Sequence, residues 1–295
     1  MRELEYPFDS EYLLKKKRSI KKALLSEGEP FTDKKIAVFG GSTTHDVIAM
    51  LELFLLNQGI RPQFYESEYG RFWQDAMFPE QELLEFRPDL IYIHTSSRNI
   101  RRFPEPGDSP EQTRRLLEQE FDYFRQMWQS VEKKFGCPVI QNNFELPGFR
   151  LMGNKDASDP GGRGYFITSL NQMFYGYAQS HDNFYVQDIL YLSASYGLER
   201  WSDPFYWHMY KYACDIQAVP ELAYNTANII KSIYGKNQKA FVLDLDNTLW
   251  GGVVGDDGAD HIEIGQETSM GQLYSEFQSY LKAHKDLGIL LSVNS

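Results

Sequence analysis

Residues 241–250 decide the fold of the C-terminal part of the chain and read Phe-Val-Leu-Asp-Leu-Asp-Asn-Thr-Leu-Trp. The apolar residues from Ala240 to Leu243 predict a short, buried parallel strand. Two aspartates one residue apart, Asp244 and Asp246, follow at its carboxyl end. Because residues i and i+2 of an extended chain point the same way, we expect both carboxylates at one site just past the strand.

Such a pair of carboxylates fits phosphoryl transfer. One carboxylate can attack phosphorus and form an acyl phosphate, and the other can protonate the leaving oxygen and then activate water. Two crowded carboxylates also require a cation, and Mg²⁺ both neutralises them and binds phosphate oxygens. The structural alternative is a strand that ends in an Asx turn and an aspartate helix cap, an arrangement that carries no chemistry.

The run from Asp244 to Gly258, DLDNTLWGGVVGDDG, resembles the first motif of the haloacid dehalogenase superfamily, in particular the phosphatase type (subfamily IIIC) that includes FkbH-like proteins. The resemblance implies a Rossmann-like core and a Mg²⁺-dependent phosphatase. Within it, Asp244 matches the nucleophile, Asp246 matches the general acid/base, and both bind the metal. Residues 250–258 match the hairpin flap beside the active site, and Ser295 matches the hydroxyl residue that binds the phosphoryl group.

The residues after the motif follow the same pattern. Residues 272–287 predict a helix that ends before Gly288, and residues 289–293 predict a second buried strand. The lysine and the later acidic pair that complete such sites would lie beyond Ser295. We therefore expect residues 1–295 alone to be inactive, with an exposed sheet edge that favours self-association.

The substrate implied by the resemblance is a phosphorylated small molecule or a group linked to a carrier protein. FkbH-like proteins that transfer a glyceryl unit to a carrier carry a cysteine just before the serine, whereas this chain has Asn294. This departure from the family pattern favours a plain phosphatase or another phosphoryl chemistry. Glyceryl or acyl transfer to a carrier protein and a partner-binding module with an incomplete phosphatase-like segment remain as alternatives.

The N-terminal part alternates strands and helices, which predicts an α/β fold with parallel βαβ units. We expect a helical arm (1–33), an SGNH-hydrolase-like or flavodoxin-like parallel sheet domain (34–236) and the first portion of a Rossmann-like haloacid dehalogenase domain (237–295). The predicted strands are 36–39, 61–66, 90–93, 138–140 and 185–192. The predicted helices are 109–135, 165–179 and a region over 203–233 that is interrupted at Pro220.

Gly40-Gly41-Ser42 at the end of the first strand resembles the nucleophile block of SGNH esterases, which FkbH-like proteins often carry in degenerate form. In that resemblance Ser42 is the nucleophile and Asn99 supplies an oxyanion contact. Asp203 and His208 stand for the Asp-x-x-His pair, although their spacing here is Asp-x-x-x-x-His. The structural alternatives are a helix cap for Ser42 and a packed helix residue for His208, and an esterase is the least favoured function.

Charge, cysteine content and hydropathy argue against several kinds of partner and site. A net charge of -11 and a pI near 5.1 disfavour nucleic acid and membrane surfaces, which are themselves anionic. The two cysteines, Cys137 and Cys214, lack metal-ligand spacing, and no apolar run reaches the roughly 20 residues that span a bilayer. These features predict a cytoplasmic protein without a nucleic-acid or membrane partner.

Overall fold

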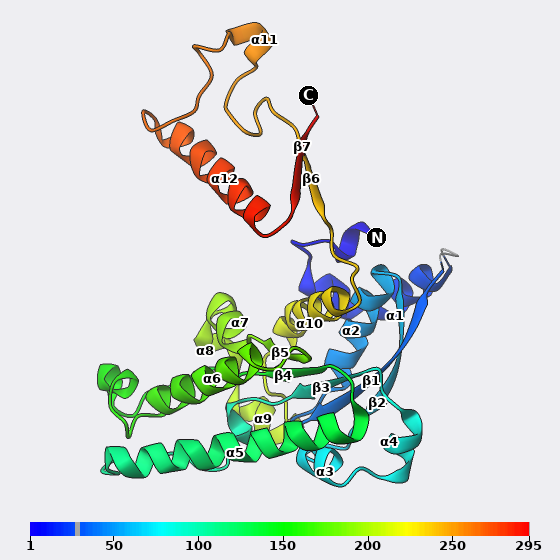
Figure 1. The fold of residues 1–295 in the computed structure, drawn as a ribbon, viewed down its shortest axis with the longest axis vertical. Helices are drawn as coiled ribbons and strands as arrows, with labels where there is room; N and C mark the ends of the chain where they lie inside the picture. Colours follow the sequence, from blue (N-terminus) through cyan, green and yellow to red (C-terminus); the bar gives the residue numbers. More distant parts are fainter. Residues whose placement is uncertain (27–29, 295) are drawn as a thin grey trace. The chain divides into compact units, whose positions relative to one another are not determined.

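A computed structural model describes residues 1–26 and 30–294. The chain forms two compact units, Met1–Tyr234 (unit 1) and Gly235–Ser295 (unit 2) (Figure 1). Helix α1 (Ser10–Ser26), which lies in the predicted N-terminal arm, buries Leu13, Ile20 and Leu24 in the core of unit 1. The arm is therefore part of that core. Within the described residues, no helix combines the length and the apolarity needed to cross a membrane.

Unit 1 is built on a five-stranded parallel sheet in the order β2-β1-β3-β4-β5. The strands are β1 (Thr32–Gly40), β2 (Ile60–Glu66), β3 (Leu90–His94), β4 (Val139–Asn142) and β5 (Phe184–Gln187). This is the flavodoxin-like order, in which the winding reverses between β1 and β3. The predicted α/β class with a parallel sheet is confirmed. The carboxyl ends of β1 and β3 flank the switch point at which such sheets bind ligands.

Helices cover both faces of this sheet (Figure 1). Ile36 and Val38 of β1 pack with α1, α2 (His45–Asn57) and α10 (Val219–Ile233). Ala37 and Phe39 belong to the opposite core, with α3 (Phe72–Met77), α5 (Pro110–Phe135) and α6 (Arg163–Gln179). The split follows from the two-residue period of a strand. The other elements of unit 1 are η1 (Arg2–Leu4), α4 (Gln81–Phe86), η2 (Ser97–Asn99), η3 (Gly153–Ala157), α7 (Ile189–Tyr196), α8 (Leu198–Trp201), α9 (Pro204–Tyr210) and η4 (Ile216–Ala218).

Two elements of unit 1 differ from the sequence prediction. Only Phe184–Gln187 joins the sheet, because the side chain of Asp188 accepts a hydrogen bond from Tyr191 N at 3.2 Å and starts α7. The helical region after residue 203 breaks at Lys211, whose φ is 58°, and α10 resumes at Val219. Pro220 lies in the first turn of α10, where its missing N–H would have no helical partner.

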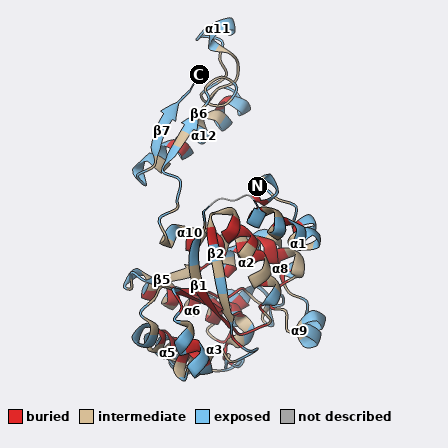
Figure 2. Ribbon diagram, turned by 90° about the vertical axis from the view of Figure 1, so that its right-hand side faces the viewer, coloured by how far each residue is buried: buried red, intermediate tan, exposed pale blue. Residues whose placement is uncertain are grey.

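Unit 2 contains two parallel strands, β6 (Ala240–Leu243) and β7 (Leu290–Val293), with Ala240 opposite Leu290. The helices α11 (Val254–Asp257) and α12 (Ser269–Asp286) lie between them in sequence. The prediction that both strands are buried is wrong, because Val242 and Leu290 are each 69% exposed (Figure 2). Among the described residues of unit 2, only Gly271 and Leu281 are buried.

Candidate functional site

The first candidate site is the turn that follows β6. Asp246 is half-buried, and its Oδ1 accepts hydrogen bonds from Trp250 Nε1 at 3.0 Å and from the backbone N of Val254 at 3.1 Å. Asp244 is exposed, and its Oδ2 accepts a hydrogen bond from Thr248 Oγ1 at 3.3 Å. Asp246 is therefore fixed in one orientation, while Asp244 presents an accessible carboxylate directly after the strand.

Asn247 closes this turn. Its φ is 55°, a left-handed conformation that asparagine adopts more readily than most residues. Its Oδ1 accepts a hydrogen bond from Gly252 N at 3.0 Å, and its own N donates to Gly252 O at 3.3 Å. The loop thus folds back and places Trp250 beside Asp246.

Residues 250–258 lie beside Asp246, as the family resemblance implies, but they differ from a two-stranded hairpin. Val254–Asp257 forms α11, and the antiparallel pairing of this stretch is a single bridge between Gly251 and Glu263. Glu263 in turn accepts a hydrogen bond from Thr268 Oγ1 at 2.6 Å, next to the start of α12. The flap is therefore a loop attached to the start of a helix.

The carboxyl end of β7 lies next to the same turn. Asn294 N donates a hydrogen bond to Leu243 O at 2.9 Å, so the residue after β7 adjoins the residue that precedes Asp244. Ser295, the predicted phosphate-binding residue, lies outside the described residues. At position 294 the side chain beside this site is a carboxamide, where a thiol would be required for thioester chemistry.

The turn offers hard oxygen ligands, but few of them. The carboxylate of Asp244 and the second oxygen of Asp246 are of the type that Mg²⁺ binds. Within residues 1–26 and 30–294, no group of three or more His, Cys, Asp or Glu side chains is placed to hold a metal ion. The two carboxylates therefore fit Mg²⁺ chemically, with water and substrate oxygens completing its coordination, as is usual for this ion.

The second candidate site is the carboxyl edge of the sheet in unit 1, where β1 and β3 end side by side. Gly41 N donates to His94 O at 2.8 Å. Asn99 Nδ2 donates to Gly41 O at 2.9 Å, and Asn99 Oδ1 accepts from Ser96 N at 2.9 Å. A Cβ on Gly41 would lie only 2.4 Å from Asn99 Oδ1, so this close approach requires glycine. The fold thus brings Ser42 and Asn99 to the same edge.

The predicted esterase residues do not form a triad. Ser42 is 1% exposed, and its Oγ has no hydrogen-bond partner among the described residues. Asp203 caps α9 by accepting a hydrogen bond from Phe205 N at 2.7 Å. His208 is exposed on α9, and in the part of the chain that the structure describes no hydrogen bond joins its ring to Ser42 or Asp203. The structural alternatives are also wrong. Ser42 is not a helix cap, because Thr44 is the N-cap of α2, and His208 is exposed and not packed in a helix interface.

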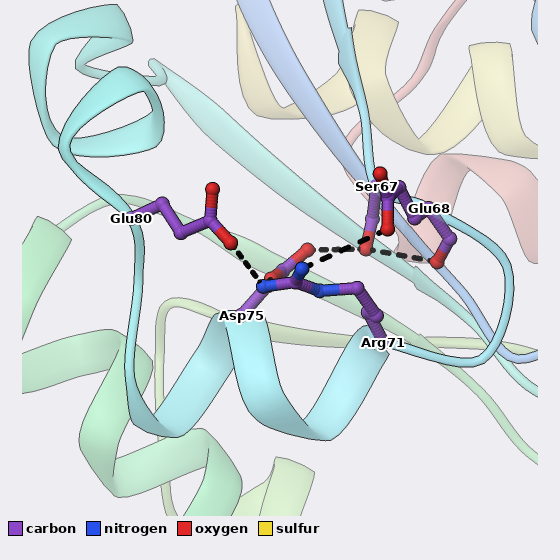
Figure 3. A network of polar contacts seen from close by, with 5 residues as sticks. All are labelled: Ser67, Glu68, Arg71, Asp75 and Glu80. Carbon is purple, nitrogen blue, oxygen red and sulfur yellow. Dashed lines mark hydrogen bonds and ion pairs between the residues drawn. The ribbon is translucent and has the colours of Figure 1, made fainter.

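A polar network holds the loop after β2 against this edge. Figure 3 shows Ser67, Glu68, Arg71, Asp75 and Glu80 joined by hydrogen bonds and ion pairs. Asp75 is 1% exposed and lies 3.3 Å from an Arg71 nitrogen, so its buried charge is compensated. Gly70 N then donates to Gly40 O at 3.1 Å, which fixes the end of β1 from the β2 side.

Sequence reasoning missed a buried polar cluster at the ends of β3 and β4. His94 Nδ1 lies 2.9 Å from Tyr92 Oη and 3.0 Å from Asn142 Nδ2. Burial lowers the pKa of His94 to about 4, so its ring is neutral at pH 7. The one sequence signal for this cluster was the polar run 141–143 directly after an apolar strand.

Comparison with known proteins relates these features to a family. A family model described as FkbH, N-terminal domain, matches residues 35–231, more than half of the chain. The chain belongs to this family. The match includes the edge with Ser42 and Asn99, whereas the turn with Asp244 and Asp246 lies outside the matched residues.

Among solved structures, the FkbH-family chain is similar to the N-terminal part of a protein from Bacteroides fragilis, which contains a phosphatase domain and is complexed with Mg. The identity is 26% and the TM-score 0.81, over 95% of this chain and 72% of that chain. A GDSL-like lipase from Bacteroides thetaiotaomicron has 13% identity and a TM-score of 0.39, over 74% of this chain and 99% of that chain. The C-terminal catalytic domain of a Streptococcus pneumoniae peptidoglycan O-acetyltransferase has 12% identity and a TM-score of 0.35, over 70% and 93%. TM-scores below 0.5 carry no functional inference, and no match was found among curated proteins.

Proposed function

We propose that Asp244 of this FkbH-family protein is the nucleophile of a Mg²⁺-dependent phosphoryl transfer of the haloacid dehalogenase kind, which hydrolyses a phosphate ester. The observation that carries the proposal is that the two carboxylates differ in hydrogen bonding and in exposure. Asp246 is held by Trp250 and Val254, whereas Asp244 is exposed at the end of β6. A nucleophile needs access to the phosphorus atom, and an acid/base needs a fixed orientation.

In the first step an Asp244 carboxylate oxygen attacks phosphorus, and the bond from phosphorus to the ester oxygen breaks. Asp246 gives its proton to that oxygen, so an alcohol leaves and an aspartyl phosphate forms. Asp246 Oδ1 accepts two hydrogen bonds, which hold this carboxyl group in one orientation for the proton transfer. Asp246 then takes a proton from water, whose oxygen attacks phosphorus and releases inorganic phosphate and the Asp244 carboxylate.

Mg²⁺, when bound to Asp244 and Asp246, would offset the charge of the phosphoryl oxygens. The carboxylate chemistry of the turn supports this assignment, as does the similarity, at 26% identity, to a protein with a phosphatase domain complexed with Mg. The substrate we propose is a phosphorylated small molecule or a phosphorylated group carried on a protein.

Glyceryl or acyl transfer to a carrier protein is a weaker candidate. A covalent thioester step requires a thiol at the site, but the residue that adjoins Leu243 is Asn294. Cys137 and Cys214, the two cysteines of the chain, both belong to unit 1, and burial raises the pKa of each thiol, to about 11 and about 12. Neither is suited to act as a thiolate nucleophile.

The test is Mg²⁺-dependent hydrolysis of p-nitrophenyl phosphate by the full gene product and its Asp244→Asn variant. Asparagine is nearly isosteric but is not a nucleophile, so the rate should fall by at least about 10³-fold. Asp260→Asn is the matched control, since Asp260 is exposed in the same unit and should be dispensable. Retention of the parent rate by Asp244→Asn would show that another residue attacks phosphorus.

A further inference from the structure

Unit 1 contains a cavity of about 510 Å³ that the proposed phosphoryl transfer does not use. It lies beyond the carboxyl ends of β3 and β4, between the loop after β3, residues 145–149 and the start of α6. A second cavity of about 440 Å³ shares the wall of residues 146–149 and continues toward Gly164 and Thr168. Both volumes are in the range of small-molecule sites.

Apolar side chains form about half of the wall of the first cavity. These apolar side chains are Ile100, Phe103, Leu146, Pro147, Phe149, Ile167 and Pro204. Ile100 and Ile167 are buried, while Phe149 is 71% exposed and lies at both cavities. An apolar chain that covered these side chains would remove apolar surface from water, which is favourable by about 25 cal/mol per Å².

Two arginines, Arg98 and Arg163, add positive charge to this wall. Within the described residues, neither guanidinium has a carboxylate oxygen within 4 Å, whereas Arg61, Arg71, Arg101 and Arg125 are all paired. Each instead faces an aromatic ring, Arg98 at 5.2 Å from the centre of Trp207 and Arg163 at 5.0 Å from that of Phe103. Ring contact leaves the N–H edge of a guanidinium available for a carboxylate or phosphate.

Two carboxylates, those of Glu145 and Glu199, also line the cavity, and neither lies within 4 Å of Arg98 or Arg163 among the described residues. Glu145 is 4% exposed, and its two oxygens accept hydrogen bonds from Ser97, from Oγ at 2.6 Å and from N at 3.1 Å. Burial raises the pKa of Glu145, and the hydrogen bonds from Ser97 and, to a smaller extent, the positive charge of Arg98 oppose that rise. Glu145 therefore anchors the turn that carries Arg98. Glu199 is exposed, lines both cavities and is in no ion pair among the described residues.

We propose that this cavity binds an amphiphilic anion, a carboxylate or phosphate monoester on an apolar chain, with the anionic group at Arg98 and Arg163. The site binds its ligand without cleaving it. Ser42 does not line the cavity and is 1% exposed, so its hydroxyl is not presented to the ligand. This ligand binds to unit 1, and its site is separate from the turn at Asp244.

Calorimetric titration with four eight-carbon probes, each below its micelle concentration, tests the proposal. Octanoate and octyl phosphate should bind, octanol should bind about tenfold or more weakly, and octylammonium should not bind, because the charge-assisted contacts are lost. The preferred anion identifies the head group. Equal binding of octanol and octanoate, or no binding of either anion, would overturn the proposal.

Variants then locate the site. Arg163→Gln should weaken octanoate binding about tenfold or more, while Arg114→Gln, an exposed arginine on α5, should leave it unchanged. The methyl NMR signals of Ile100 and Ile167 should shift on titration of the parent protein, and that of Ile229 on α10 should not. Unchanged binding by a folded Arg163→Gln protein, or shifts confined to other residues, would place the anion elsewhere and refute the assignment.

Discussion

The contact between Gly41 and Asn99 makes a quantitative prediction about the carboxyl edge of unit 1. In Gly41→Ala the new methyl carbon would lie 2.4 Å from Asn99 Oδ1 and 2.6 Å from Asn99 Cγ, so the carboxamide has to move. Its two hydrogen bonds, to Gly41 O and from Ser96 N, are then lost. At about 1 kcal/mol each, the free energy of unfolding should fall by about 2 kcal/mol.

A double-mutant cycle isolates this interaction. Asn99→Ala alone should also cost about 2 kcal/mol, since it removes the same two hydrogen bonds. In the double variant the Asn99 carboxamide is absent, so the alanine at position 41 meets no clash with it. The double variant should therefore be about as stable as Asn99→Ala, with a coupling energy of about 2 kcal/mol.

The assay is urea unfolding followed by circular dichroism, with Gly176→Ala as the control. A Cβ on Gly176, in the last turn of α6, would meet nothing within 4 Å. That substitution should be neutral or stabilising by up to about 1 kcal/mol, because alanine favours the helix. A Gly41→Ala protein as stable as the parent, or single effects that simply add in the double variant, would refute the packing described at this edge.

Three further predictions concern single side chains. The pKa of His94 is lowered to about 4 when folded, against about 6.5 when unfolded, so its contribution to stability is complete above pH 6.5 and declines as the pH falls toward 4. Between pH 7.5 and pH 4.5 the parent should lose about 2.5 kcal/mol more of its unfolding free energy than His94→Gln, and equal losses in urea titrations would contradict the buried neutral ring. Ser42→Ala should leave phosphatase activity unchanged, and hydrolysis of short acyl esters should be undetectable in the parent. Ester hydrolysis that disappears with Ser42→Ala would revive an esterase. Asp246→Asn should lower the phosphatase rate by about 10²–10⁴-fold, and a smaller loss would remove Asp246 from the role of acid/base.

Local sequence signals predicted the elements of the sheet well. The apolar run after Lys35 and the proline that follows Ser109 are features of a strand and of a helix start, and both elements formed as expected. The helix at Ile189 was missed, because an apolar run after a strand has no clear period and the capping role of Asp188 is visible only in three dimensions.

The sites were predictable only where their residues are neighbours in sequence. Asp244 and Asp246 follow one strand, so a short motif reveals them. The contact between His94 and Asn142 joins residues 48 positions apart and exists because β3 and β4 are adjacent in register. Arg98 and Arg163 are 65 positions apart in sequence. They line the same cavity because of the order of the strands in the sheet and the position at which α6 begins.

Phosphorylation of Asp244 is tested most directly by trapping the aspartyl phosphate. The full gene product, incubated with Mg²⁺ and p-nitrophenyl phosphate, is quenched in acid and reduced with borohydride, which converts an aspartyl phosphate into homoserine. Peptide mass spectrometry should find homoserine at position 244, in the peptide that contains Leu243 and Leu245, and not at Asp246. Turnover with homoserine at another aspartate, or with an unmodified Asp244 in every trapped sample, would show that Asp244 is not the nucleophile.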